Sequence, residues 1–193
     1  MTLPTIHDLD FSKLTLLPSD DRVALKLDEK AVWFNLCRTR SVPVKTRYPL
    51  DAAWEGGSRR GLTVALQADQ TELLRRLDAL GCEKVVASAK QIFGQPLTLA
   101  QVRARYEPLL KEKDGEALLK FKVKCERVPT KLYFADESPA PLSLLEDGRA
   151  EVVPILSLPL LWFMDERSRF GLCCQAEGMI VAPAERLFDA FSK

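Results

Sequence analysis

The stretch that decides the fold is Lys120-Phe121-Lys122-Val123-Lys124-Cys125, in which charged and apolar side chains alternate strictly. Successive side chains of a β-strand point to opposite faces, so the alternation predicts a strand with three lysines on one face. The other face carries Phe121, Val123 and Cys125, and we expect Phe121 to lie in the core. Three lysines on one face repel each other, and an anionic ligand would turn that repulsion into attraction. Two interpretations stay open from this stretch alone: the solvated face of a half-buried strand, and a surface that follows the phosphates of a nucleic acid.

The rest of the chain predicts further strands on both sides of one helical region. Predicted strands cover residues 22–27, 30–38, 60–67, 117–127, 131–135, 151–164 and 169–181. A helical insertion is expected at about 69–108, with Asp69 as the N-cap of its first helix and Gly81 at that helix's end, and Thr98 before a later one. A short final helix is expected at about 183–192. This order indicates a mostly β fold with a helical insertion, which we predict to be a single domain, 1–193, built as a small OB-fold-like β-barrel.

Charge is distributed unevenly along the sequence. The net charge is +1 over 193 residues, so attraction to a polyanion must come from a local surface. No Asp or Glu occurs from Ala31 to Leu50, where four basic residues stand: Arg38, Arg40, Lys45 and Arg47. From residue 136 to 151 the balance reverses, with five acidic residues against Arg149 alone. We therefore expect basic and acidic surfaces on different sides of the fold.

The cysteines and the apolar stretches predict the compartment of the protein and whether it contacts a membrane. The five cysteines form no CxxC pair, which favours reduced thiols in an intracellular, reducing compartment. Met1 to Asp10 has no basic region of the kind that begins a signal peptide. The most apolar stretch, Val152 to Met164, is too short to cross a bilayer and contains Pro154 and Pro159. We therefore expect no membrane partner.

The sequence contains no recognisable catalytic or metal-binding motif. His7 is the only histidine, and there is no zinc spacing, nucleophile elbow or phosphate-binding loop. The segment Gly56 to Gly61 leads into a strand and is better interpreted as a hairpin turn with an arginine-rich edge. Adjacent carboxylates such as Glu146-Asp147 fit solvated turns. The sequence thus predicts no enzyme, no cofactor and no metal, and an enzyme using loop carboxylates and a metal is the least favoured alternative.

Basic residues and aromatic residues are interleaved throughout the chain. Proteins that hold single-stranded nucleic acid stack bases on aromatic rings while cations follow the phosphates. The opposite interpretation, that most of these rings are core, stays open from the pattern. The candidate contacts are Lys120, Lys122, Lys124, Arg38, Arg40, Arg47, Trp54, Arg59, Arg60, Lys131, Trp162, Phe163, Arg169 and Phe170.

The order of motifs in the second half supports a resemblance. The segments are 118–124, then Lys131-Leu132-Tyr133-Phe134, the apolar run 152–161, Trp162-Phe163, and Arg169-Phe170-Gly171-Leu172 followed by an alternating strand. This order resembles the single-stranded-DNA-binding proteins of large nucleocytoplasmic DNA viruses and, more remotely, those of short-tailed bacteriophages. The resemblance implies an oligonucleotide-binding fold that coats single-stranded DNA in replication, recombination or repair, in a nucleus or viral replication site. It points to the three lysines of 120–124, to Trp162 and Phe163, and to Arg169 and Phe170.

The C-terminus departs from the phage pattern. Those proteins end in a long acidic tail that contacts replication partners, whereas residues 185–193 here contain no acidic run. Tail-mediated recruitment of replication proteins is therefore in doubt. Leu187, Phe188 and Phe191 would instead dock on their own barrel or, in a homodimer, on a second subunit. The alternative function is an OB-fold scaffold subunit that binds proteins in a replication or transcription complex.

Overall fold

The computed structural model describes residues 4–19, 22–39, 42–52, 58–126 and 128–183. Arg40, Trp54 and the predicted final helix at about 183–192, with Leu187, Phe188 and Phe191, lie outside these residues, apart from Pro183. Within them, strands predominate over helices, and the prediction of a mostly β fold is confirmed. No described helix is both long and apolar enough to cross a membrane.

Five strands form a ring of pairings. They are β4 (Val44–Thr46), β5 (Arg59–Ala65), β8 (Glu116–Lys124), β13 (Gln175–Pro183) and β10 (Ala150–Ser157). Each pairs with the next in this order, and β10 pairs back to β4. Only the β8–β13 pairing is parallel. A closed ring of five strands with this mixed order is consistent with an OB-like fold.

Other short strands extend the ring at its edges. β3 (Trp33–Asn35) pairs with β10, β7 (Leu110–Lys113) pairs with β8, and β9 (Lys131–Tyr133) runs parallel to β13. The predicted strand over 30–38 is therefore confirmed only in its centre.

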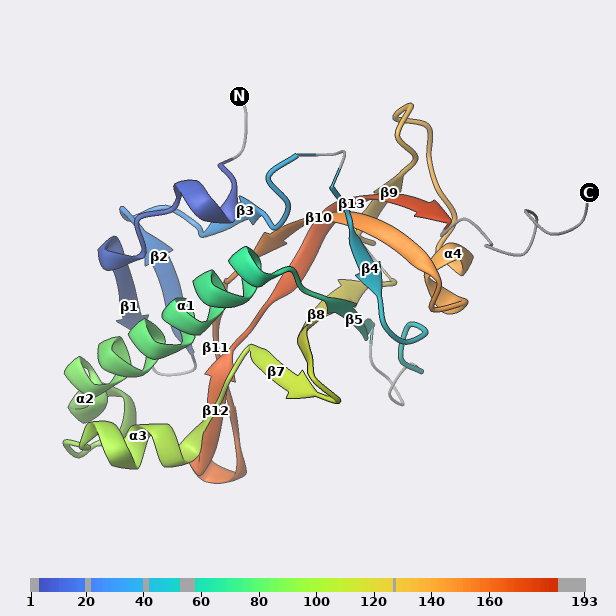
Figure 1. The fold of residues 1–193 in the computed structure, drawn as a ribbon. Coiled ribbons are helices and arrows are strands. Elements are labelled where there is room, and N and C mark those ends of the chain that lie inside the picture. The colour runs from blue at the N-terminus through green and yellow to red at the C-terminus, as the bar shows by residue number, and fades with distance from the viewer. Residues whose placement is uncertain (1–3, 20–21, 40–41, 53–57, 127, 184–193) are drawn as a thin grey trace, which may run out of the picture.

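A second, smaller sheet lies beside the ring (Figure 1). Its order is β1 (Leu14–Pro18), β2 (Val23–Leu27), β11 (Leu160–Met164), β12 (Arg169–Leu172) and β6 (Tyr106–Glu107). The β11–β12 hairpin comes from the connection between β10 and β13. Along the sequence, the hairpin therefore connects two strands of the ring. Its hydrogen bonds, however, belong to the small sheet.

The predictions of continuous strands over 151–164 and 169–181 are wrong. The chain leaves one sheet and enters the other at 158–159 and returns at Cys173-Cys174. Cys173 N donates to Leu160 O in the small sheet at 2.8 Å, and Lys122 N in the ring donates to Cys174 O at 2.9 Å. The two adjacent cysteines mark the point where the backbone changes partners.

Three helices fill the connection between β5 and β7. They are α1 (Ala68–Ala87), α2 (Ala89–Phe93) and α3 (Leu99–Arg105), and a short α4 (Ser143–Glu146) precedes β10. The first three lie on the side of the molecule that carries β1 and β2 (Figure 1). Thr98 caps α3 as predicted, accepting from Gln101 N at 3.3 Å.

Two predicted boundaries of α1 are wrong. The N-cap is Gln67 and not Asp69, and Gln67 N donates to the side chain of Gln70 at 3.0 Å. Gly81 does not end the helix, which continues to Ala87. Gly81 is buried within it and faces Leu172 of β12, where a Cβ would make only an ordinary contact with Leu172 Cδ1 at 3.5 Å.

The alternation in β8 divides core from surface as predicted. Phe121 is 1% exposed and Val123 is fully buried, and both belong to the main hydrophobic core. The lysine side chains of β8 point to the outer face of the ring. The alternation over 120–125 thus gives β8 an inner face packed in the core and an outer face that carries the lysines.

Candidate nucleic-acid interface

The three lysines of β8 differ in what surrounds them. Lys120 Nζ lies 2.5 Å from Asp51 Oδ2, and Lys124 Nζ lies 3.1 Å from Glu177 Oε2. Lys122 forms no ion pair with any residue that the structure describes. The middle lysine is therefore the one whose charge is free for a ligand.

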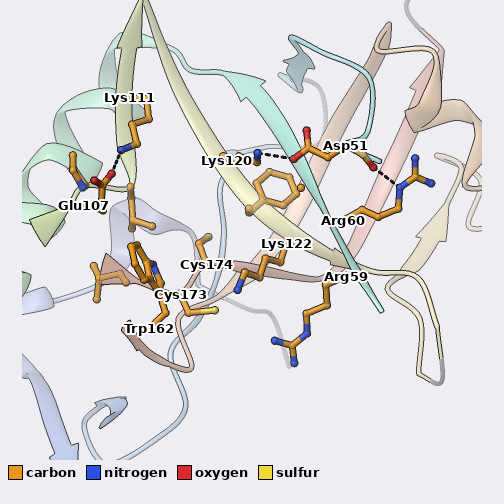
Figure 2. A pocket seen from close by; sticks show the side chains of 15 residues that line it. Asp51, Arg59, Arg60, Glu107, Lys111, Lys120, Lys122, Trp162, Cys173 and Cys174 are labelled. Atoms are coloured by element: carbon orange, nitrogen blue, oxygen red, sulfur yellow. Dashed lines mark hydrogen bonds and ion pairs between the residues drawn. The ribbon is translucent and has the colours of Figure 1, made fainter. Parts of the chain in front are cut away.

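Lys122 faces a groove on the outer side of β5 and β8. The groove encloses about 450 Å³. It is lined by residues of β5, β8 and β11, by 107–109 and Lys111, by 172–174, and by Asp51. Figure 2 shows Lys122, Arg59 and Trp162 around the same hollow, with Cys173 between them. Arg59, like Lys122, has no acidic partner within the described part of the chain. Two uncompensated cations and an indole ring thus meet in one concave site.

The place of the groove in the ring follows from topology. β5 and β8 are the second and third strands of the ring in chain order. Asp51 comes from the connection between the first two strands, and Trp162 comes from the connection between the last two. In OB folds the face of strands two and three and these two connections bind oligonucleotides.

Trp162 owes its position to a glycine on the neighbouring strand. It pairs with Gly171 across the β11–β12 hairpin. A Cβ at Gly171 would lie 2.8 Å from Trp162 Cζ2 and 2.6 Å from Glu107 O. The absence of a side chain at 171 therefore lets the indole lie against β12 at the edge of the groove.

Other charges at the groove are held in local pairs. Arg60 donates to Glu146 at 2.6 Å and to the carbonyl oxygens of Asp51 and Leu50 at 2.5 and 3.2 Å. Arg60 therefore fixes the connection after β4 more than it offers a charge to a ligand.

Glu107 holds two further cations. Its carboxylate accepts from Lys111 Nζ at 2.7 Å and from Arg169. These hydrogen bonds, led by that from Lys111, lower the pKa of Glu107. Arg169, a predicted contact, is thus tied to a carboxylate at the rim.

The cysteines at the groove are not poised as nucleophiles. Burial raises the pKa of Cys173, although Lys122 and Arg59 oppose the shift. Burial raises the pKa of Cys174 still further. Both thiols are therefore protonated at neutral pH. Over the described residues there is also no group of three His, Cys, Asp or Glu side chains that could hold a metal ion.

Several predicted contacts lie away from the groove lining. Arg38 approaches His7 Nδ1 at 3.3 Å and Asp69 at 3.8 Å. Arg47 pairs with Glu116. Lys131 is exposed on β9. The structure does not bring these three cations together with Lys122.

Two predicted aromatic contacts belong to a separate cluster. Phe170 is fully buried, with ring centroids 5.6 Å from Phe93 and 5.6 Å from Tyr106, and Phe163 is half-buried 6.1 Å from Phe170. Phe170 has no surface on which a base could stack, so the expectation of direct contact at this residue is wrong. The residues that pair with Phe170 on the two neighbouring strands are Phe163 of β11 and Tyr106 of β6. Their rings pack against Phe170 and keep it buried.

The sequence did not indicate Asp51, Gly61, Glu107 or Lys111 as part of the site. Asp51 and Lys120 meet only because β5 pairs with β8, and a Cβ on Gly61 would collide with both side chains. A glycine in the middle of an otherwise regular strand was the one available signal, because such glycines mark close approaches.

The fold and the groove define a mostly β protein whose ring of strands is consistent with an OB-like fold and carries a cationic and aromatic outer face. No protein-family model matches the chain, and no curated protein matches it. Among solved structures, it is similar to gp2.5, a single-stranded DNA binding protein encoded by bacteriophage T7. That similarity has a TM-score of 0.53 at 12% identity and covers 81% of this chain and 89% of the other.

The single-stranded DNA-binding protein from bacteriophage Enc34 also matches, with a TM-score of 0.48, 10% identity and coverage of 94% and 96%. Its complex with single-stranded DNA matches with a TM-score of 0.48, 11% identity and coverage of 91% and 98%. At such identities the likeness to the T7 protein shows a shared fold. The resemblance to proteins of large DNA viruses stays a prediction.

Proposed function

We propose that this protein binds single-stranded DNA, without enzymatic activity, along the outer face of β5 and β8. It would be an OB-fold barrel that coats single strands exposed in replication, recombination or repair. The observation that carries the proposal is the meeting of Lys122, Arg59 and Trp162 in one groove, at the face that OB folds use. The neighbouring solved structures are named as single-stranded DNA-binding proteins, which agrees with it.

The mechanism divides the work between charge and stacking. Arg59 and Lys122 take the phosphates, since they have no acidic partner among the described residues. Trp162 offers a ring face to a base, and one such stack contributes about 1–3 kcal/mol. In this scheme no side chain forms a hydrogen bond with the edge of a base, so we expect little sequence preference.

A second candidate function is an OB-fold scaffold that binds another protein. One observation favours it: several predicted cations are already neutralised, among them Lys124 by Glu177 and Arg47 by Glu116. A surface whose charges are internally paired attracts a polyanion less, and the net charge of only +1 adds no long-range attraction.

A titration of fluorescein-labelled oligo-dT at two salt concentrations, with duplex DNA in parallel, separates the two functions. Single-strand binding predicts preference for oligo-dT and affinity that falls steeply with salt, because bound cations release counterions. The double variant Arg59→Glu/Lys122→Glu should lose more than about tenfold in affinity, and its log–log salt slope should fall by about 1.4.

The matched control reverses two charges elsewhere. Arg76 and Lys90 are exposed on α1 and α2 and do not line the groove. Arg76→Glu/Lys90→Glu makes the same change in net charge and should bind oligo-dT like the wild type. Salt-insensitive binding, absent binding, or equal losses in both double variants would contradict single-strand binding in this groove.

A further inference from the structure

The ion pair between Lys120 and Asp51 lies across the floor of the groove. Nζ and Oδ2 are 2.5 Å apart, directly over β5 at Gly61. A Cβ on Gly61 would collide with Lys120 Cε and Asp51 Oδ2, so the glycine leaves the space over β5 in which the pair lies. Figure 2 shows Lys120, from β8, and Asp51, from the connection before β5, joined at their charged ends.

The carboxylate of Asp51 can leave this position without a change in the main chain. Asp51 N donates to Gly61 O at 2.9 Å, and its carbonyl oxygen accepts from Arg60 Nε at 2.5 Å. These bonds hold the backbone of the connection. Among the residues that the structure describes, Lys120 is the one ion-pair partner of the carboxylate.

The pair at the other end of the lysine row is built differently. Glu177 accepts from Ser157 Oγ at 2.6 Å and Gln175 Nε2 at 2.7 Å as well as from Lys124. Its side chain is 16% exposed, against 35% for Asp51, and Lys124 is 26% exposed against 56% for Lys120. A pair in solvent with one contact exchanges partners at small cost, whereas a network of buried contacts does not.

We propose that Asp51 is an internal counter-anion that occupies a phosphate site at Lys120 and gives way to the ligand. This inference rests on the proposed binding of single-stranded DNA. Lys122 and Arg59 are open to a first phosphate, and Lys120 becomes available when a neighbouring phosphate of the same strand displaces the carboxylate. Asp51 therefore weakens binding and makes it depend on a ligand with more than one phosphate in reach.

Asp51→Asn tests the exchange, because it removes the charge and keeps the shape and the backbone bonds. The affinity for fluorescein-labelled oligo-dT at low salt should rise about two- to fivefold, the range expected from freeing one exposed ion pair. The gain should shrink as salt screens the charges. In a Lys120→Gln background the same substitution should give no gain, since the freed site is gone.

Asp28→Asn is the matched control. Asp28 is an exposed partner of Lys13 at 3.4 Å and does not line the groove, so this variant changes net charge equally. It should leave the affinity unchanged, and melting curves should show all variants folded.

An unchanged or weaker affinity of Asp51→Asn would overturn the proposal. An equal gain with and without Lys120 would also overturn it, because the effect would then be one of net charge. If the wild type binds oligo-dT and only the Asp51 prediction fails, the proposed function stands. If the wild type binds no single strand, both fail.

Discussion

The β11–β12 hairpin presents aromatic rings beside cations on both of its sides, with different consequences. On one side Trp162 lies at the groove near Lys122 and Arg59. On the other side Phe163 and Phe170 pack against each other and against Phe93 of α2. The two sides have similar composition, yet one is open to a ligand and the other is closed by the fold.

The residue opposite each ring decides the difference. Trp162 pairs across the hairpin with Gly171, so the indole lies over a residue without a side chain, whereas Phe163 pairs with Phe170, which extends the apolar layer. The cations also differ, because Arg167 lies over the Phe163 ring at 5.4 Å and donates to Ile92 O. Trp162 and Phe163 are both half-buried, and only Trp162 lines the groove. An aromatic–basic pattern therefore indicates a ligand site only where the partner strand lets the ring line a groove.

The largest effect is expected on the closed side. Phe170→Ala removes a fully buried ring that packs against three other rings, and the free energy of unfolding should fall by about 3–5 kcal/mol. Urea unfolding followed by circular dichroism measures it. At temperatures where the variant is folded, its affinity for oligo-dT should equal that of the wild type.

Phe170→Leu is the companion variant, since it keeps most of the apolar volume. It should recover most of the lost stability. A stable Phe170→Ala protein with weakened DNA binding would mean that the closed side contacts the ligand. Both sides of the hairpin would then belong to the binding site.

The next effect is expected on the open side. Trp162→Ala should weaken oligo-dT binding by about 1–3 kcal/mol, roughly five- to 150-fold, through loss of base stacking. Its salt slope should stay unchanged, because no phosphate contact is removed. Fluorescence anisotropy at several salt concentrations measures both quantities.

Trp162→Phe separates stacking from simple bulk. A smaller ring still stacks, so the variant should bind with intermediate affinity. Wild-type affinity in Trp162→Ala, or a full loss in Trp162→Phe, would show that the ring does not act as a stacking surface.

Much of the arrangement of β8 could be predicted from the sequence, because the alternation of side chains along a strand is a local property. Strict alternation places Phe121 inside and Lys122 outside in any strand with one buried face. The aromatic–basic pattern also picked out Arg59 and Trp162, which the structure brings to the same groove. These predictions needed no knowledge of distant residues.

The rest depended on contacts between distant segments. Which lysine is free follows from the positions of Asp51 and Glu177, which only strand pairing sets. The division of 151–164 between two sheets follows from a change of hydrogen-bond partner that hydrophobicity does not report. Gly81 was interpreted as a helix end because local signals cannot show that β12 packs against it.

The smallest effect is expected at Lys124, which belongs to the lysine row of β8 but does not line the groove and is held in a half-buried network. Burial alone would raise the pKa of Glu177, but hydrogen bonds from Ser157, Lys124 and Gln175 outweigh it, and the pKa is lowered. A carboxylate with a lowered folded-state pKa adds stability above its unfolded pKa of about 4.3 and loses it as pH falls through the folded value.

At pH 7, Glu177→Gln should therefore be less stable than the wild type by about 1 kcal/mol. In urea unfolding the difference should shrink as the pH falls below the unfolded pKa and be lost once the pH is below the folded one, with oligo-dT affinity nearly unchanged at neutral pH. A difference independent of pH would show that shape and not charge holds this network. A gain of affinity like the one expected for Asp51→Asn would place Lys124 with Lys120, among the cations whose counter-anion a ligand displaces.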